Sequence, residues 1–298
     1  MSSGSNIFDQ SLLRVRQRRA RLQKPATFLL DRVATDLGER LSAVLRRFDV
    51  AVDLGTPTDA VRRVLATSGN VGTTITAGLR DDESITRVAA DEEALPFADG
   101  SLDLVVSALT LQFVNDLPGV LIQIRRALKP DGLFLAALAG GDSLTELRSA
   151  FAAAESEVEG GGSPRVAPFA DVRELGGLLQ RAGFALPVVD SERLVVRYDS
   201  ALALMRDLRR MGATNILHER RRKPLRRGTL ERVTEIYADR FSDPDGRVRA
   251  TFEIIWLSAW ASHESQQKPL KPGSAAQRLA DALGTSEIPA GEKPERSS

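Results

Sequence analysis

One turn in this chain combines the residue types that could hold a nucleotide-like cofactor. Residues 50–54 predict a buried strand, Gly55 follows directly, and a helical pattern begins a few residues later. Turns of this kind bind cofactors because glycine lets backbone N–H groups approach the ligand closely. Residues 56–59 are Thr-Pro-Thr-Asp, where a cofactor-binding turn would carry further glycines. Gly55 could therefore contact a cofactor or serve only the turn, and both interpretations stay open.

Acidic side chains are concentrated at residues 90–97, Ala-Asp-Glu-Glu-Ala-Leu-Pro-Phe. The carboxylate of Asp91 or Glu92 could accept a hydrogen bond from an exocyclic amine such as that of adenine. A solvated acidic loop is the alternative when the octet is considered alone. A strand pattern at 102–107 follows at once and favours the binding interpretation, because open α/β sheets bind ligands at their strand ends.

Further polar residues follow two later strands, on the side where a substrate would bind. Gln112 could hydrogen-bond a substrate and Leu109 could line its pocket, although part of 108–113 could instead be core. Asp142 comes after a Gly-Gly pair that permits close backbone approach. It could be a functional carboxylate or only the N-cap of a helix at 143–157, and the sequence favours the cap, worth about 1 kcal/mol.

The segments that must position these residues alternate between strand and helix patterns. Such alternation predicts an α/β fold with a parallel sheet covered by helices on both faces. A turn is predicted at 129–132, Lys-Pro-Asp-Gly, and helix ends are predicted at Gly183 and Gly212. The predicted strands are 49–55, 71–77, 85–89, 102–107, 133–138, 184–189, 193–198 and 251–260. The predicted helices are 59–66, 117–128, 143–157, 171–182, 200–211 and a segment ending near 241.

Composition argues against several classes of function. The net charge is +1 and basic residues are not interleaved with aromatic ones, so we expect no nucleic-acid partner. The chain has no cysteine and two histidines, so we expect no disulfide and no metal site. No apolar run reaches about 18 residues, so we expect no transmembrane segment.

Two arginine-rich segments have less specific interpretations. Residues 14–21 contain five arginines and partly resemble a transit peptide, but Asp9 and the neighbouring apolar residues favour a short ordinary helix. Residues 220–227 also contain five arginines, and they could bind phosphate or an acidic protein surface, or form a solvated loop. The role of this second segment stays open.

Taken together, the motifs resemble those of class I S-adenosylmethionine-dependent methyltransferases. The motifs that carry this resemblance are 52–55 (Val-Asp-Leu-Gly), the octet 90–97, 102–107 (Leu-Asp-Leu-Val-Val-Ser) and 128–132 (Leu-Lys-Pro-Asp-Gly). A second set resembles the mitochondrial complex I assembly factor family of arginine hydroxylases, with its alphaproteobacterial relatives, and more distantly the malonyl-carrier-protein methyltransferase of biotin synthesis. This set is 6–9 (Asn-Ile-Phe-Asp), 113–118 (Phe-Val-Asn-Asp-Leu-Pro), 140–144 (Gly-Gly-Asp-Ser-Leu), 159–164, 181–184, 211–215 (Met-Gly-Ala-Thr-Asn) and 263–265.

The resemblance implies a class I methyltransferase (Rossmann-like) fold with a mostly parallel seven-stranded sheet. We expect an N-terminal helical segment at 1–48 and a methyltransferase-like domain at 49–265. Within that domain, a helical insertion for substrate or partner is expected at about 200–245. Residues 266–298 are rich in Pro, Gly, Ser, Lys and Glu and are predicted to be a disordered tail.

By position, the resemblance implies S-adenosyl-L-methionine as the cofactor and assigns residues to it. Asp53 and Gly55 would lie at its methionine end, and Asp91 and Glu92 near its adenine. Leu109 would lie beside the ribose or the substrate. The candidate catalytic residues on the substrate side are Asp142, Gln112 and Arg148.

The implied activity is hydroxylation of an arginine in a protein substrate, an iron–sulfur subunit of respiratory complex I. Two alternatives stay open: methyl transfer to a small or carrier-linked acid, and a catalytically inactive assembly chaperone. Residues 56–59 bear on all three, since their side chains would crowd a bound carboxylate and Asp59 would repel it. The implied location is the bacterial cytoplasm, including the inner-membrane surface, or the mitochondrial matrix in a eukaryote.

Overall fold

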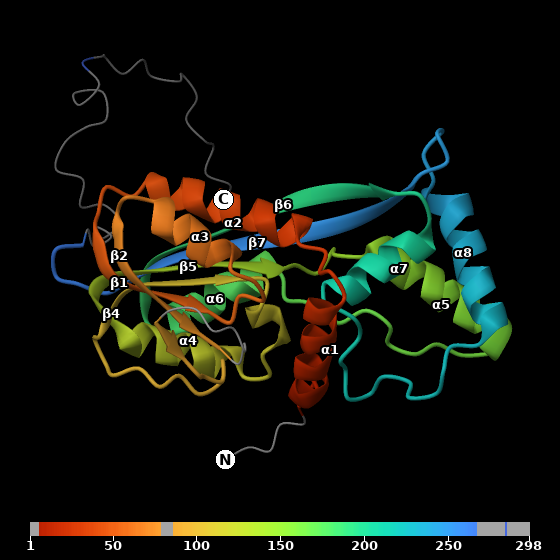
Figure 1. The fold of residues 1–298 in the computed structure, drawn as a ribbon, viewed down its shortest axis with the longest axis horizontal. Helices are drawn as coiled ribbons and strands as arrows, with labels where there is room; N and C mark the ends of the chain where they lie inside the picture. The colour runs from red at the N-terminus through yellow and green to blue at the C-terminus, as the bar shows by residue number, and fades with distance from the viewer. Residues whose placement is uncertain (1–5, 79–85, 267–283, 285–298) are drawn as a thin grey trace, which may run out of the picture. The chain divides into compact units, whose positions relative to one another are not determined.

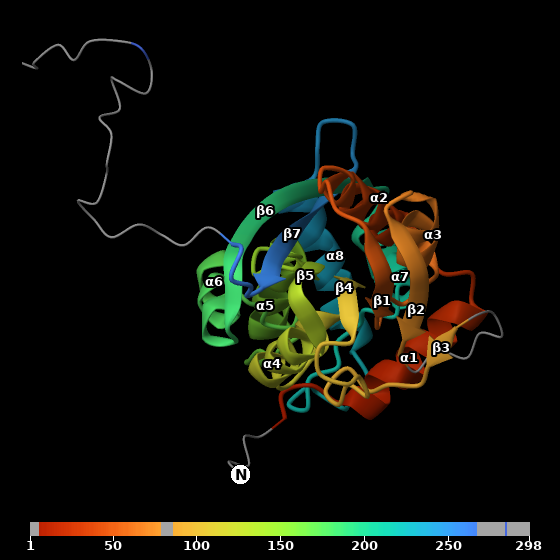
Figure 2. The same cartoon turned by 90° about the vertical axis from the view of Figure 1, so that its left-hand side faces the viewer.

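A mixed β-sheet forms the centre of the protein. The computed structural model describes residues 6–78, 86–266 and 284. Within these ranges the sheet has seven strands in the order β3-β2-β1-β4-β5-β7-β6 (Figures 1 and 2). The strands from β3 to β5 are parallel, and β7 is antiparallel to both of its neighbours. The strands are β1 Phe48–Leu54, β2 Val71–Ala77, β3 Arg87–Val88, β4 Leu102–Ala108, β5 Leu128–Ala139, β6 Phe184–Tyr198 and β7 Val248–Ala261. The predicted mostly parallel α/β sheet is confirmed.

Two of the strand predictions are wrong in detail. Residues 129–132 do not form a separate turn but continue β5, where Asp131 has a φ of +64° and the pairing with β4 shifts register. Such a bulge keeps the chain in the sheet while bending it. The predicted strands 184–189 and 193–198 form one strand, because β7 pairs with β6 across the polar residues between them. The predicted strand at 85–89 is reduced to β3, and residue 85 lies outside the described residues.

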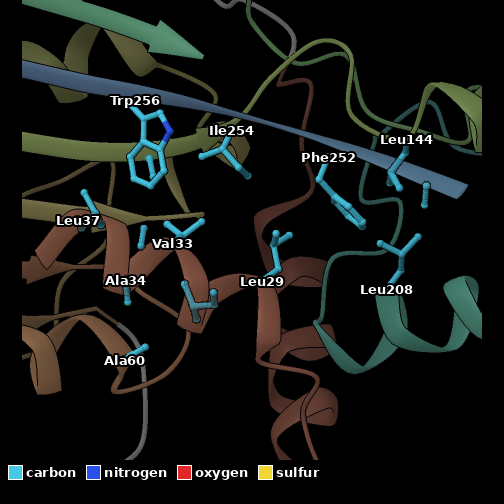
Figure 3. Close-up of a cluster of buried hydrophobic side chains, with 14 of the residues drawn as sticks. Leu29, Val33, Ala34, Leu37, Ala60, Leu144, Leu208, Phe252, Ile254 and Trp256 are labelled. Carbon is cyan, nitrogen blue, oxygen red and sulfur yellow. The ribbon is translucent and has the colours of Figure 1, made fainter. Parts of the chain in front are cut away.

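Alternate residues of the central strands fill two cores, one on each face of the sheet. In β5, Leu133 and Leu135 pack into the first core, and Phe134 and Leu138 pack into the second. This alternation is the period of a strand buried on both faces. Figure 3 shows part of the first core, where Val33 and other residues of α2 face β7.

Helices cover both faces, as Figures 1 and 2 show. α2 Phe28–Ser42 and α3 Ala60–Thr67 pack on the first face, and α4 Leu117–Ala127 and α6 Val172–Arg181 pack on the second. Local signals fix these boundaries. The Asp171 carboxylate accepts a hydrogen bond from Glu174 N at 2.8 Å to start α6, and Gly183 follows its end at a φ of +83°.

The helix α5 Thr145–Glu159 begins differently from the prediction. Leu144 occupies the N-cap position at a φ of +57°, without a side-chain cap. The Ser143 hydroxyl instead bonds the backbone of Glu253, donating to its O at 3.1 Å and accepting from its N at 3.0 Å. The Asp142 carboxylate forms an ion pair with Arg193. The predicted cap by Asp142 is therefore wrong, because Arg193 of β6 holds its carboxylate and the helix begins two residues later than predicted.

β6 and β7 extend beyond β5 as a two-stranded ribbon (Figure 1). β5 pairs with β7 residues 254–260, whereas β6 pairs with β7 as far as Val248. The remaining edge of β7 is satisfied by other groups: Thr251 N donates to the buried Glu146 carboxylate at 3.0 Å, and Thr251 O accepts from Leu144 N at 2.7 Å. α5 packs against α8 Arg227–Phe241 beside this ribbon, and α8 in turn contacts α7 Ala201–Arg210.

The N-terminal helix α1 Gln10–Leu22 lies against α7 and the segment that follows it. Its first turn is capped by Asp9, whose carboxylate accepts from Leu12 N at 2.9 Å. Phe8 forms a β-bridge with Leu217. Gly212 has a φ of +73°, and a Cβ there would lie 3.0 Å from the Cα of Gln17, so glycine allows the close approach.

The elements described so far belong to one unit, Met1–His263, and Glu264–Ser298 form a second. The expected boundaries at 48 and 265 stay predictions. Most of the expected tail at 266–298 lies outside the described residues. Within the described ranges, no helix combines the length and the apolar character needed to cross a bilayer.

Candidate functional site

Two adjoining cavities lie between α1 and the carboxyl ends of β1, β2 and β4. The first, the polar chamber, has a volume of about 210 Å³. The second, the apolar chamber, has a volume of about 120 Å³. The polar chamber is bordered mainly by Arg14, Arg18, Gly55, Thr56, Thr76, Asp91, Glu92, Glu93 and Thr110. The apolar chamber is bordered mainly by Leu29, Leu109, Gln112, Leu144, Phe169, Leu208, Met211, Phe252 and Ile254. Residues bordering both chambers are Gln17, Arg21, Pro57 and Phe113.

Gly55 is required both by the turn and by the polar chamber. Its φ is +70°, in the left-handed region that favours glycine. A Cβ at this position would lie 2.6 Å from Thr110 Cγ2 and 2.9 Å from Glu92 Oε1. Thr110 donates its hydroxyl to Gly55 O at 2.8 Å and so fixes the turn against the end of β4. The two interpretations of Gly55 are thus not exclusive.

The residues after Gly55 crowd the chamber less than the sequence predicts. Thr56 is buried, and its hydroxyl accepts a hydrogen bond from Ala108 N at 3.4 Å. Asp59 borders neither chamber and pairs with Arg62 at 3.5 Å and Arg63 at 3.3 Å. The expected repulsion by Asp59 is therefore wrong, because two arginines of α3 hold its carboxylate outside the chamber. Pro57 does border both chambers, as expected of a side chain in this turn.

Three consecutive carboxylates border the polar chamber in different environments. Asp91 pairs with Arg14 of α1 at 2.7 Å, and Glu93 accepts from Asn115 N at 2.7 Å. Burial, with a further contribution from the charge of Asp91, raises the pKa of Glu92 above its ordinary value. Glu92 is thus a poorly solvated acceptor that a ligand donor would stabilise.

Asp53, a further cofactor candidate, is fully buried inside β1 and borders neither chamber. It lies two residues before Gly55 in the strand that carries the turn. The structure therefore brings Gly55, Asp91 and Glu92 together and keeps Asp53 behind them.

The apolar chamber holds Leu109 and Gln112. Leu109 has a φ of +52°, an uncommon conformation for a residue with a side chain. Gln112 Oε1 is shielded from solvent and has no hydrogen-bond partner among the described residues. A buried amide oxygen without a donor costs about 1–3 kcal/mol, so this atom is a candidate for a bond to a substrate N–H group. Figure 3 shows Leu29, Leu208 and Phe252 converging on the region that this chamber occupies.

The other two catalytic candidates border neither chamber. Asp142 is exposed and paired with Arg193, and its backbone N donates to Glu253 Oε2 at 2.9 Å. Arg148 donates to the carbonyl oxygens of Gly141 and Ser143, each at 3.4 Å. The structure thus brings Gln112 into the chambers, and it brings neither Asp142 nor Arg148.

Sequence reasoning missed the contribution of α1. Arg14, Arg18 and Arg21 border the polar chamber, whereas the pattern of these residues predicts only a short helix. The buried Leu13 and Ala20 give that helix an apolar stripe. A stripe indicates that a helix covers something, but it does not identify what is covered. Among the described residues, no group of three or more His, Asp or Glu side chains is placed to hold a metal ion.

Known proteins are similar in sequence to this chain over most of its length. The profile of a methyltransferase domain family matches residues 52–136. The mitochondrial arginine-hydroxylase NDUFAF5 of Danio rerio is 37% identical over 290 residues, which cover 93% of this chain and 90% of that protein. The Homo sapiens protein of the same name is 38% identical over 282 residues, covering 91% and 81%. The chain belongs to the NDUFAF5 family.

One further sequence match to this NDUFAF5-family chain and two solved structures bear on the fold. The malonyl-[acyl-carrier protein] O-methyltransferase of Laribacter hongkongensis is 42% identical over 186 residues, covering 62% of this chain and 60% of that protein. A crystal structure from Bacillus halodurans, described as a candidate methyltransferase, has a TM-score of 0.53 at 16% identity, covering 77% of this chain and 100% of that one. The YcgJ protein of Bacillus subtilis has a TM-score of 0.51 at 16% identity, covering 76% and 98%. The fold is that of class I methyltransferases.

Proposed function

We propose that this chain is an arginine hydroxylase that acts on a protein, as the names of its NDUFAF5 relatives say of those proteins. The observation that carries the proposal is the unpartnered Gln112 Oε1 beside a narrow apolar chamber. An arginine side chain has an apolar stem followed by a planar group of N–H donors. The chamber walls suit the stem, and Gln112 Oε1 suits one of those donors.

The proposed cofactor is S-adenosylmethionine, bound in the polar chamber. The cofactor carries an amino group, a sulfonium and a carboxylate, and the chamber presents both carboxylates and guanidinium groups. Asp91 and Glu92 would accept its N–H or O–H donors, and Arg18 would balance its carboxylate. The side chain missing at Gly55 leaves space for it beside Thr110. When bound, this cofactor would supply an activated methyl group on sulfur, which methyl transfer consumes and the hydroxylation described next does not.

The proposed reaction replaces one C–H bond of the arginine side chain with C–OH. With dioxygen as the oxidant, one oxygen atom enters the product and the other leaves as water. A reductant must then supply two electrons and two protons. The part proposed for the residues described here is to hold and orient the arginine. The proposed substrate is an iron–sulfur subunit of respiratory complex I, encountered in the bacterial cytoplasm or the mitochondrial matrix.

Mass spectrometry of that subunit tests the proposal. The subunit would be incubated with the protein, S-adenosylmethionine, dioxygen and a reductant, and its arginine peptides would be sequenced. A gain of one oxygen atom supports hydroxylation. A gain of one methylene group would overturn it in favour of methyl transfer. An unmodified subunit in cells whose complex I still assembles through this protein would favour an inactive chaperone.

Gln112→Leu makes the test specific for the apolar chamber. We expect kcat/KM to fall about tenfold or more, because one hydrogen bond to a charged group is lost. The thermal unfolding midpoint should not fall, since the substitution removes a buried acceptor without a partner. Gln180→Leu, at an exposed position on α6, is the matched control and should leave kcat/KM unchanged. An unchanged kcat/KM for Gln112→Leu would remove this residue from the site.

A second candidate, methyl transfer to a carrier-linked acid, is favoured by one observation. Arg21 and Arg210 border the apolar chamber, and Asp and Glu are absent from its described lining. A guanidinium at the chamber wall could bind the free carboxylate of such an acid. The same incubation with a malonyl-carrier protein, followed by detection of a methyl ester, distinguishes this candidate from the first.

A further inference from the structure

A groove rich in arginine continues from the apolar chamber to the surface. Its inner part has a volume of about 290 Å³ and shares Phe113, Leu144, Phe169 and Leu208 with the apolar chamber. Arg16 of α1 and Arg209 of α7 border both this inner part and the outer part that follows. We call the two parts together the basic groove. The basic groove and the chamber where Gln112 is found therefore lie next to each other.

The charges of the basic groove are balanced at its inner end. There Arg165 pairs with the buried Glu155, and Arg221 pairs with Glu159. Arg220, at the same end, pairs with Asp9 at 3.2 Å. These guanidinium groups are already engaged.

The outer end of the groove has an excess of positive charge. Arg16 is half-buried and donates to a backbone oxygen, that of Asn215. Burial, together with the like charges of Arg220, Arg19 and Arg209, lowers the pKa of Arg16, although Asp9 opposes this shift. Arg19 and Arg209 are exposed, and no carboxylate pairs with either among the described residues. Three guanidinium groups thus meet with little compensation, and an anionic ligand would relieve their repulsion.

We propose that an acidic segment of the protein substrate docks on Arg16, Arg19 and Arg209 while the neighbouring target side chain enters the apolar chamber. This inference rests on the proposed action on a protein. The cations line a concave groove between two helices, which admits an extended chain and presents them poorly to a flat lipid surface. The groove also explains a role for α1 beyond covering the polar chamber.

Binding of a labelled acidic peptide tests the inference without any turnover. The probe is a fluorescein-labelled decapeptide of glutamate and glycine, with a lysine–glycine peptide as its counterpart, measured by anisotropy. We expect the acidic peptide alone to bind, and we expect Arg19→Glu/Arg209→Glu to weaken its binding about tenfold or more. Raising the salt from about 0.05 M to 0.5 M should also weaken binding.

The matched control keeps the same change of net charge at a different place. Arg47 and Arg173 are exposed and border neither the groove nor the chambers. Arg47→Glu/Arg173→Glu should bind the acidic peptide within about twofold of the parent. If the charge reversal disturbs folding, the milder Arg19→Gln/Arg209→Gln replaces it. This variant should also bind the acidic peptide more weakly than the parent does. Equal affinities for all variants would overturn the inference, and so would binding to vesicles of anionic lipid without binding to the peptide.

Kinetics with the subunit separate this inference from the proposed function. If both hold, Arg19→Glu/Arg209→Glu should raise KM about tenfold and leave kcat within about twofold, because docking is lost and chemistry is not. Peptide binding at the groove without any modification of the subunit would contradict the proposed hydroxylation and leave the docking groove supported. Modification of the subunit with an unchanged KM in the double variant would contradict the docking groove and leave the proposed hydroxylation supported.

Discussion

The polar and apolar chambers share a wall but are built from opposite kinds of surface. The polar chamber is bordered by charged side chains of both signs, some of which come from α1. The apolar chamber is formed largely by side chains of the first core, including Leu144, Leu208 and Phe252, with Gln112, Arg21 and Arg210 among its polar residues. Packing therefore determines the shape of one chamber, and directed polar groups determine what the other accepts. Substitutions of the apolar wall residues should cost mainly stability, and substitutions of the charged residues around the polar chamber should cost mainly binding.

Gly55→Ala is expected to have the largest effect. It should not follow the contrast between the chambers, because it should lower both stability and binding. Gly55 borders the polar chamber, yet its φ of +70° and the 2.6 Å approach of Thr110 Cγ2 make it structural as well. We expect a loss of about 2–4 kcal/mol in the free energy of unfolding from strain and overpacking. Affinity for S-adenosylmethionine should fall together with stability. Urea denaturation and calorimetric titration measure the two effects, and unchanged stability would show that the turn tolerates a side chain.

Phe252→Ala should show the stability side of the contrast. Phe252 is 5% exposed in the first core and borders the apolar chamber. Its removal should cost about 3 kcal/mol, at the low end for such a change because a cavity already adjoins the ring. Phe28→Ala, at a position 42% exposed on α2, should cost about 0.5 kcal/mol. Equal losses for the two variants would show that the chamber wall is not part of the packed core.

Glu92→Gln should sharpen the contrast through its dependence on pH. Burial raises the pKa of Glu92 above its ordinary value of 4.5, so the folded protein holds this proton more tightly than the unfolded chain. The carboxyl group imposes no penalty below pH 4.5, and its penalty on folding grows as the pH rises through the folded-state pKa. The variant should therefore be more stable than the parent near neutral pH and equal to it in acid. Thermal unfolding across this range checks the result, and a difference independent of pH would contradict it.

Arg14→Ala should have the smallest effect on stability. The pair of Arg14 and Asp91 joins α1 to the acidic loop, but the two side chains are 44% and 45% exposed. Solvent screening limits such a pair to less than about 1 kcal/mol. Denaturation at low and high salt should give nearly the same small difference. A loss of several kcal/mol would mean that this pair, and not the packing of Leu13 and Ala20, holds α1 in place.

Much of the fold follows from the sequence because local patterns and burial agree. β2 matches the predicted strand at both ends, and α6 has its predicted boundaries within one residue, since Asp171 caps it and Gly183 follows it. The prediction separates β6 into two strands because polar residues normally end a strand. Here β7 supplies partners along the whole length of β6, so the local signal is overridden.

The candidate site was predictable where its residues follow strands. Gly55, Glu92 and Gln112 lie at strand ends and meet at the chambers for that reason. Asp142 also follows a strand, but Arg193 from the distant β6 holds it outside. The place of α1 depends on contacts with residues about 200 positions away, such as that between Phe8 and Leu217, and no local pattern encodes them.

Glu146 has a consequence for the behaviour of the protein in solution. Its carboxylate takes the hydrogen bond that another strand would accept from Thr251 N at the edge of the ribbon. Exposed strand edges are templates on which a second chain can add, leading to aggregation. Ser143, Leu144 and Glu146 together cover this edge of β7, and Glu146→Ala would remove one part of that cover. The buried carboxylate of Glu146 thus helps to prevent aggregation by strand addition at this edge.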